Sequence, residues 1–366
     1  MYQTKITEKE AGQRFDKYLR RILPNAGSSF IYKMLRKKNI TLNDRKADGS
    51  EKIAVGDSVS IYFSDETLEK FMGKSISGDF LPGGKEKTIS GVRIIYENDH
   101  ILLVDKPAGV LSQKAQQTDV SLNEWLIGYL LDSGFIREEE LTAYKPSVCN
   151  RLDRNTSGIV LCAKSLKCAQ MLGELLKNRT LHKYYQLYVK GRVTEEQIVE
   201  GYLRKDEKHN KVYIIPDKSR TNTKIQATAD ICAPVDKSCA SQSQTSRWQN
   251  QVQDGREAYI KTAYKPIRIE EDKTLLEVEL ITGKSHQIRA HLASIGHPLL
   301  GDYKYGDPAW NEMYRKRYHV RSQLLHAYKV VFPQLEEPFT DISGRTFYAE
   351  LPDIFEKISA KSKNMN

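Results

Sequence analysis

Beyond residue 91 the chain repeatedly alternates apolar with polar residues, which is the pattern of a β-strand with one buried face. In the clearest case Leu276, Val278 and Leu280 alternate with Glu277 and Glu279. Further segments with this pattern, or with a short apolar run, are 92–96, 101–104, 159–163, 185–189 and 257–267. Helical spacing occurs at fewer places, in a helix that begins near Ser121 and in one over 165–177. Strands therefore outnumber helices, and this region predicts a domain built on a sheet.

The first 64 residues follow a different pattern. Two short amphipathic helices are predicted, one carrying Phe15 to Ile22 and one that follows Ser28 as a capping residue. Short strands are predicted at 40–43 and 59–63. The second helix turns four basic residues away from its apolar stripe, namely Lys33, Arg36, Lys37 and Lys38. The simpler interpretation of that pattern is a charged helix face that contacts only solvent.

Three segments of this region, 12–19, 31–38 and 55–57, resemble the small RNA-binding domain named after ribosomal small-subunit protein four. The resemblance covers about residues 12–64. It implies that the basic second helix, with Lys33, Arg36, Lys37 and Lys38, lies against RNA phosphates.

We therefore predict three parts in the chain. Residues 1–64 form the small α/β RNA-binding domain, the glycine-rich stretch 65–91 is a linker, and 92–360 form a larger domain. Residues 232–255 are rich in Ser, Gln and Asn, and we expect a mobile surface insertion there.

Charge and composition favour a soluble protein with a polyanionic partner. The net charge is +10, and residues 1–60 hold 13 Lys and Arg against 7 Asp and Glu. No apolar run approaches the roughly 18 to 20 residues that cross a bilayer. The N-terminal residues lack the apolar core of a secretory signal, and the five cysteines form no C-x-x-C pair. We expect a cytoplasmic protein with reduced thiols and no membrane association.

The loop from Asn150 to Gly158 contains the first candidate for chemistry. Asp153 in such a loop is ordinarily a turn residue. However, Arg151 and Arg154 flank it and favour its charged form, which a nucleophile or a base requires. The loop also leads directly into the buried strand 159–163.

The segment 280–292 invites two interpretations that fail. Gly283, Lys284 and Ser285 suggest a phosphate-binding loop, but that motif needs glycine where this chain has Val278. His286 and His291 are five residues apart, which places them on different faces of a helix, so a metal site is not predicted there. A helix over 285–295 would hold Arg289 at its core-facing margin, where a buried arginine needs a carboxylate.

Together, the motifs beyond residue 91 closely resemble those of the RluA-type pseudouridine synthases. The matching segments, in order along about residues 92–352, are 106–109, 150–158, 183–191, 283–292, 296–298, 301–302, 305–306 and 324–327. One position departs from the family pattern, because Asn150 stands where members commonly have histidine.

The resemblance implies an α+β fold with a large mixed, mainly antiparallel sheet. It also implies an isomerase that converts uridine to pseudouridine without cofactor or metal. Asp153 would act as the nucleophile on the ribose, Arg289 would pair with it, and Tyr185 would stack on the base. Arg151 would fill the space left by the target uridine, and Leu325 would close the pocket. Both an acylal route and a glycal route stay open.

The N-terminal domain favours large-subunit ribosomal RNA as the substrate, and we expect a monomer. The alternatives are a transfer-RNA pseudouridine synthase, a non-catalytic ribosomal RNA-binding protein and a base-excising enzyme. Isomerisation leaves the mass of the RNA unchanged, whereas excision of a base does not.

Overall fold

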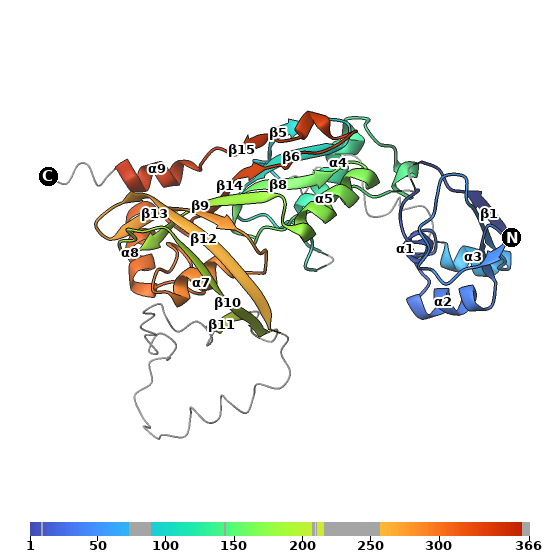
Figure 1. Cartoon of the computed structure of the whole chain (residues 1–366), viewed down its shortest axis with the longest axis horizontal. Coiled ribbons are helices and arrows are strands. Elements are labelled where there is room, and N and C mark those ends of the chain that lie inside the picture. The colour runs from blue at the N-terminus through green and yellow to red at the C-terminus, as the bar shows by residue number, and fades with distance from the viewer. Residues whose placement is uncertain are drawn as a thin grey trace, which may run out of the picture. The chain divides into compact units, whose positions relative to one another are not determined.

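The computed structural model describes residues 1–8, 10–72, 89–116, 118–142, 144–206, 209, 211–215 and 257–360. The predicted insertion 232–255 and most of the predicted linker lie outside these residues. The chain divides into two compact units, and Figure 1 labels helices and strands of both. The first contains residues 1–154 and 160–178, and the second contains 155–159 and 179–366.

The first unit begins with a small antiparallel sheet in the order β1-β4-β2-β3. Its strands are β1 (Tyr2–Lys5), β2 (Ile40–Leu42), β3 (Arg45–Lys46) and β4 (Ser58–Ile61). Helices α1 (Phe15–Ile22) and α2 (Ser28–Arg36) bury Phe15, Leu19, Ile31 and Leu35 in a common core with this sheet. The two amphipathic helices predicted from spacing are therefore present.

A third helix, α3 (Asp65–Phe71), lies where the sequence predicts a linker. Its Leu68 is buried in the same core, and Phe71 and Met72 pack against that core. Ser64 caps the helix by accepting a hydrogen bond from the Thr67 N–H. The core of the small domain therefore extends past residue 64, the boundary expected from composition.

The rest of the first unit contributes strands and helices on both sides of the loop that contains Asp153. They are β5 (Arg93–Glu97), β6 (Ile101–Lys106), α4 (Leu122–Asp132), the 3-10 helix η1 (Glu138–Thr142), β7 (Ser147–Val148), most of β8 (Ser157–Ala163) and α5 (Leu166–Asn178). Ser121 and Glu124 form a capping box at the start of α4, in agreement with the predicted helix start.

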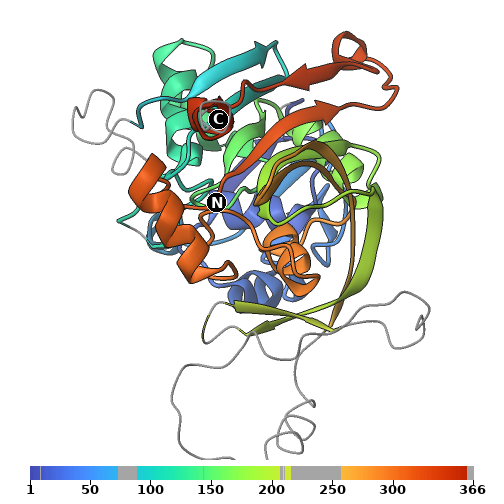
Figure 2. The same ribbon diagram turned by 90° about the vertical axis from the view of Figure 1, so that its left-hand side faces the viewer.

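The second unit is a curved sheet with helices (Figure 2). Its elements are β9 (His182–Lys190), β10 (Gln197–Asp206), β11 (Lys211–Ile215), β12 (Ala258–Ile269), β13 (Lys273–Leu280), α7 (Gln287–Ser294), α8 (Pro308–Tyr318), β14 (Leu325–Val331), the 3-10 helix η2 (Thr340–Ile342), β15 (Thr346–Tyr348) and α9 (Asp353–Ala360). No helix among the described residues is long and apolar enough to cross a membrane.

The large sheet has the strand order β11-β10-β12-β13-β9-β14-β8-β6-β5, with β15 beside β14 and β7 beside β8. Its described pairings are mostly antiparallel, and β14 runs parallel to β8. The expected α+β class with a large mixed, mainly antiparallel sheet is confirmed.

The parallel pairing of β14 with β8 needs a glycine. Gly158 has φ +112°, and a Cβ there would lie 2.2 Å from the Ala327 carbonyl oxygen. The backbones can approach this closely only because position 158 has no side chain. Gly158 thus fixes the point at which the Asp153 loop enters the sheet.

Candidate active site

The loop from Asn150 to Arg154 is held at several points along its length. The Asn150 side-chain oxygen accepts a hydrogen bond from the Leu161 N–H of β8 at 2.7 Å. The Ser112 hydroxyl accepts from the Leu152 N–H and donates to the Leu152 carbonyl oxygen, both at 3.0 Å. The amide at position 150 thus holds the loop although the histidine common in the resembling family is absent.

Lys106 fixes the other side of the loop. Its Nζ donates to the carbonyl oxygens of Pro107 at 3.0 Å, Val110 at 2.8 Å and Arg154 at 3.2 Å. The side chain is fully buried. Burial lowers the pKa of the ammonium to about 8, while the nearby charge of Asp153 acts in the opposite direction. A buried cation therefore lies within electrostatic reach of the candidate nucleophile.

Where the loop joins β8, the Ser157 hydroxyl lies 2.8 Å from Nδ1 of His326 on β14. Both residues are buried, and they face each other in the parallel pairing of the two strands. This bond and the close approach at Gly158 hold the end of the loop to the sheet.

Arg289 lies on α7, as the helical spacing predicts, with Ile288 and Leu292 buried beside it. The helix begins at Gln287 rather than near 285, because His286 has a left-handed backbone conformation with φ 55°. The Arg289 guanidinium donates from Nε to one carboxylate oxygen of Asp302 at 2.7 Å and from an Nη to the other at 2.9 Å.

Asp302 is itself fully buried and held by its neighbours. One carboxylate oxygen also accepts hydrogen bonds from the N–H groups of Lys304 and Tyr305. Burial favours the neutral acid, but Arg289 and these N–H groups outweigh it, so the pKa of Asp302 stays below its ordinary value. Asp302 is thus a charged partner for the arginine, in bidentate geometry.

Tyr185 and Leu325 lie on neighbouring strands of the second unit. Tyr185 is on β9 opposite Ala327 of β14, and Leu325 is opposite Leu187. Residues 185 and 187 share one face of their strand, so Leu325 is a diagonal neighbour of Tyr185 on that face. Both side chains are only 5% exposed. The two residues expected to contact the base therefore share one surface.

The remaining expected site residues are placed as follows. Arg151 and Arg154 are exposed, and Asp153 is partly exposed between them. Asp153 belongs to the first unit, whereas Tyr185 and Arg289 belong to the second. The expected pairing of Asp153 with Arg289 therefore stays a prediction.

The two histidines considered as metal ligands, and His297 further along the chain, have other neighbours. His286 Nδ1 lies 2.9 Å from the Tyr305 hydroxyl, His291 Nδ1 lies 3.0 Å from the Thr262 hydroxyl, and His297 Nδ1 lies 3.1 Å from the Lys190 carbonyl oxygen. Burial lowers the pKa of His291 to about 4. Within the described ranges, no group of three or more His, Cys, Asp or Glu could hold a metal ion.

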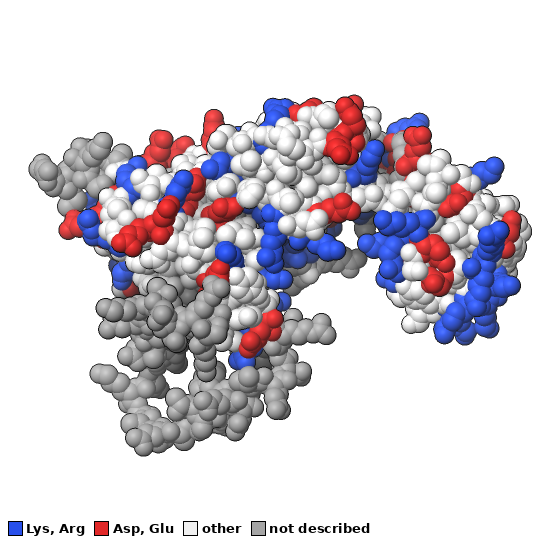
Figure 3. Space-filling model, viewed as in Figure 1, with Lys and Arg blue, Asp and Glu red and all other residues white. Residues whose placement is uncertain are grey.

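The basic residues expected to contact RNA phosphates all point away from the core of the small domain. Those on α2 and just after it are exposed, and none makes an ion pair with a described residue; they are Lys33, Arg36, Lys37 and Lys38. Figure 3 shows Lys and Arg side chains gathered over this domain.

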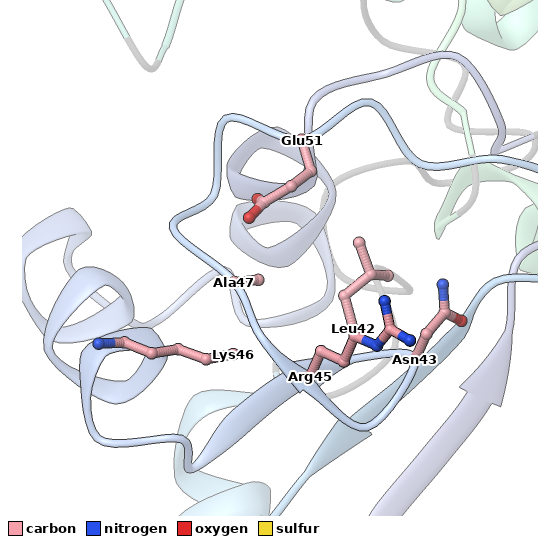
Figure 4. Close-up of a pocket in the computed structure, with 6 residues that line it drawn as sticks. All are labelled: Leu42, Asn43, Arg45, Lys46, Ala47 and Glu51. Carbon is pink, nitrogen blue, oxygen red and sulfur yellow. The ribbon is translucent and has the colours of Figure 1, made fainter.

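A pocket of about 510 Å³ lies on the β2–β3 hairpin of the same domain (Figure 4). Its lining includes exposed Arg45 and Lys46, together with Leu42 and Asn43. The Glu51 carboxylate in this lining accepts hydrogen bonds from the N–H groups of Asp48 and Gly49, and it makes no ion pair with Arg45 or Lys46 among the described residues. Sequence reasoning missed Arg45 and Lys46, since only the helical basic residues showed a pattern.

A model of the RNA pseudouridylate synthase family matches residues 100–294, which is more than half of the chain. The chain belongs to this family. The matched range includes Asp153, Tyr185 and Arg289. The protein is therefore an RNA pseudouridine synthase, an isomerase whose substrate is RNA.

Relatives extend the similarity over most of the chain. An RNA pseudouridine synthase of Mycoplasma genitalium is 26% identical over 336 residues, which cover 90% of this chain and 89% of that protein. The ribosomal large subunit pseudouridine synthase C of Vibrio vulnificus is 27% identical over 338 residues, which cover 91% of this chain and 89% of that one. The solved structure of human RNA pseudouridylate synthase domain containing 4 has a TM-score of 0.51 and 18% identity, and it covers 74% of this chain and 92% of that one. That last likeness concerns the fold alone.

Three residues of this synthase were not singled out by sequence reasoning, namely Lys106, Ser112 and Asp302. Lys106 and Asp302 occur in recognised motifs. The sequence could therefore have suggested Lys106 as a support of the Asp153 loop and Asp302 as the partner of Arg289. No signal in the sequence marks Ser112, because its role depends on the contact with Leu152.

Proposed function

We propose that this synthase isomerises specific uridines of large-subunit ribosomal RNA, with Asp153 as its nucleophile. The observation that carries the proposal is the set of hydrogen bonds around Asp153, which hold the residues on both sides of one partly exposed carboxylate. A reactive group needs such support because small displacements from the productive geometry are costly.

The chemistry requires that the bond from ribose carbon 1 to nitrogen 1 of uracil breaks and that a bond from carbon 1 to carbon 5 forms. Carbon 5 then loses its proton and nitrogen 1 gains one, so the composition of the RNA does not change. In the acylal route, a carboxylate oxygen of Asp153 bonds to carbon 1, and the electron pair of the broken bond leaves with the uracil ring. In the glycal route, a base removes the proton from ribose carbon 2 while the uracil ring leaves with the electron pair of the broken bond, and the proton returns to carbon 2 when carbon 5 bonds to carbon 1. Deuterium at ribose carbon 2 gives a primary isotope effect in the second route only, so the size of the effect separates the two routes.

The other residues receive supporting roles. Arg289, which Asp302 holds through Nε and one Nη, would pair with Asp153, because a guanidinium with five N–H groups can bind more than one carboxylate. Tyr185 and Leu325 would contact the flipped uracil from their shared face. Arg151, exposed beside Asp153, would fill the space that the target uridine leaves in the RNA.

The choice of ribosomal RNA rests on two observations. Relatives that align with most of this chain are named ribosomal large subunit pseudouridine synthases C and D. The small N-terminal domain adds exposed cations on α2 and at the β2–β3 hairpin that make no ion pair with a described residue, and such cations suit a large folded polyanion.

The decisive experiment maps pseudouridines in cellular RNA with and without this protein. We expect discrete carbodiimide-dependent stops in large-subunit ribosomal RNA to disappear when the gene is deleted and to return with the wild-type copy. If a copy with a substitution at Asp153 fails to restore the stops, that result supports Asp153 as the nucleophile. Loss of sites in transfer RNA alone would overturn the assignment of substrate, and an unchanged map would overturn the proposed function.

A further inference from the structure

Ser112 makes an unusual pair of contacts with the loop that contains Asp153. Its single hydroxyl accepts from the N–H and donates to the carbonyl of the same residue, Leu152, with both distances 3.0 Å. In extended backbone the N–H and C=O of one residue point the same way, so a hydroxyl placed opposite both can replace a neighbouring strand. Ser112 is 2% exposed and Leu152 is 7% exposed.

These bonds have no substitute among the described residues. The Leu152 main chain has no other hydrogen-bond partner there, and water has little access to a residue this buried. Buried backbone groups that lose their partners are costly, so the loop would move to satisfy them. The residue directly after Leu152 is Asp153, and its carboxylate would move with the loop.

The same short segment of chain also supports the residue after Asp153. The N–H of Gly109 donates to the Arg154 carbonyl oxygen at 2.9 Å, and Lys106 Nζ donates to the same oxygen at 3.2 Å. Residues 106–112 therefore hold the main chain on both sides of Asp153 through the Leu152 backbone and the Arg154 carbonyl oxygen.

We propose that Ser112 is a positioning residue for the isomerisation, which acts by fixing the Leu152 main chain and hence the direction of the Asp153 carboxylate. The proposal rests on the proposed role of Asp153 as nucleophile. Ser112 touches no reacting atom, so its loss affects the rate of the chemical step and leaves RNA affinity unchanged.

The test compares Ser112→Ala with Ser112→Thr and with a matched control, Ser60→Ala, in the full-length protein. Ser60 is fully buried on β4, and its hydroxyl has no hydrogen-bond partner among the described residues, so Ser60→Ala removes the same atom elsewhere. The substrate is a large-subunit ribosomal RNA transcript with tritium at uracil carbon 5, and tritium release is followed in single turnover. We expect Ser112→Ala to slow release on the order of 10- to 100-fold with unchanged Kd. Ser112→Thr, which keeps a hydroxyl, and Ser60→Ala should stay near wild type.

A second measurement does not depend on activity. Hydrogen exchange of the peptide containing residues 150–154 should be faster in Ser112→Ala than in wild type and unchanged in Ser60→Ala. A wild-type rate in folded Ser112→Ala, or a rate loss that only follows the unfolded fraction and is not restored by threonine, would overturn the proposal. If the wild-type protein forms no pseudouridine, the proposed function fails, and the exchange result still shows whether Ser112 holds the loop.

Discussion

Arg289 and Asp302 form a buried bidentate ion pair, with the Arg289 Nε 2.7 Å from one carboxylate oxygen and one Nη 2.9 Å from the other. Asp302 is fully buried, and Arg289 is 7% exposed. A buried cation without a carboxylate is strongly unfavourable. Asp302 therefore compensates the charge of the buried Arg289 guanidinium and also fixes its direction.

The Asp302→Asn variant removes the charge and keeps the shape. We expect it to lower the free energy of unfolding by about 3–5 kcal/mol and the single-turnover rate by roughly 10- to 100-fold.

The pKa of Asp302 is depressed in the folded protein, so its contribution to stability is present above the unfolded pKa of about 4 and is lost as pH falls below it. Wild-type stability should therefore fall more steeply than that of Asp302→Asn as acid is added. Glu312→Gln, which breaks an exposed ion pair with Arg315, is the control and should change neither quantity measurably; equal effects of both variants would contradict the assignment.

Asp153→Asn tests the nucleophile with the smallest change in shape. We expect pseudouridine formation to fall by more than about 10⁴-fold while RNA binding is retained, because the amide can neither attack ribose carbon 1 nor carry the charge. Carbodiimide-dependent primer extension measures the product, and filter binding measures affinity. Asp99→Asn, at an exposed turn, is the matched control and should be fully active. Product from Asp153→Asn at a rate near wild type would end this assignment.

Local patterns were sufficient to predict most elements of the fold that surround the loop. The run at 159–163 predicted β8, and the alternation of Leu276, Val278 and Leu280 predicted β13, because a strand with a buried face imposes that periodicity. The helix predicted to begin at residue 285 begins at Gln287, because His286 has a left-handed backbone conformation. A spacing pattern does not reveal such a conformation. The position of β14 between β8 and β9 joins segments that are far apart in the chain, and no local pattern indicates such a pairing.

The candidate site likewise contains some residues that the sequence predicted and others that it did not. Motif resemblance pointed to Asp153, Tyr185 and Arg289, and the match to the synthase family covers all three. The position of Asp302 in a motif could have pointed to it as the carboxylate beside Arg289, whereas Ser112 is defined only by a contact that folding creates. The sequence context of Ser112 looks ordinary, since any buried serine would fit it.

Gly158→Ala tests whether the close approach of β8 and β14 positions the loop. A Cβ at residue 158 would lie 2.2 Å from the Ala327 carbonyl oxygen, and φ there is +112°. We expect a loss of about 2–5 kcal/mol in the free energy of unfolding, from overpacking and backbone strain together. Gly128→Ala, in α4 with no atom within 4 Å of the added Cβ, should instead be neutral or stabilise by about 0.5–1 kcal/mol. Urea unfolding of both variants gives the comparison, and equal stabilities would contradict the packing argument.

A fourfold variant tests the electrostatic role of α2, with glutamine in place of Lys33, Arg36, Lys37 and Lys38. Each lost phosphate contact should lower the slope of log Kd against log salt by about 0.7–0.9, so loss of all four contacts should lower the slope by about 2.8–3.6. The single variant Lys357→Gln, at an exposed position on α9, is the control for removing a surface cation. Unchanged salt slopes in the fourfold variant would show that this helix does not contact RNA.

Lys106 predicts an activity change in mildly alkaline solution. Burial lowers the pKa of its ammonium to about 8, against the charge of Asp153, and its Nζ serves three carbonyl oxygens. Above that pH the neutral amine has two N–H groups for three acceptors, and the cation near Asp153 is gone. We therefore expect the single-turnover rate of the wild type to fall as pH rises through about 8. Stability should change in the opposite direction between about pH 8 and 10, because the unfolded chain then binds more protons than the folded one.

Lys106→Gln separates this effect from ionisation of the RNA, which affects both proteins equally. The variant has two amide N–H groups at every pH, so its rate should be lower at pH 7 and should show no inflection near pH 8. The ratio of the two rates across pH 6–9.5 therefore isolates the lysine, with circular dichroism showing that the variant is folded. If the ratio is constant across this range, the ammonium of Lys106 does not support the Asp153 loop in its charged form.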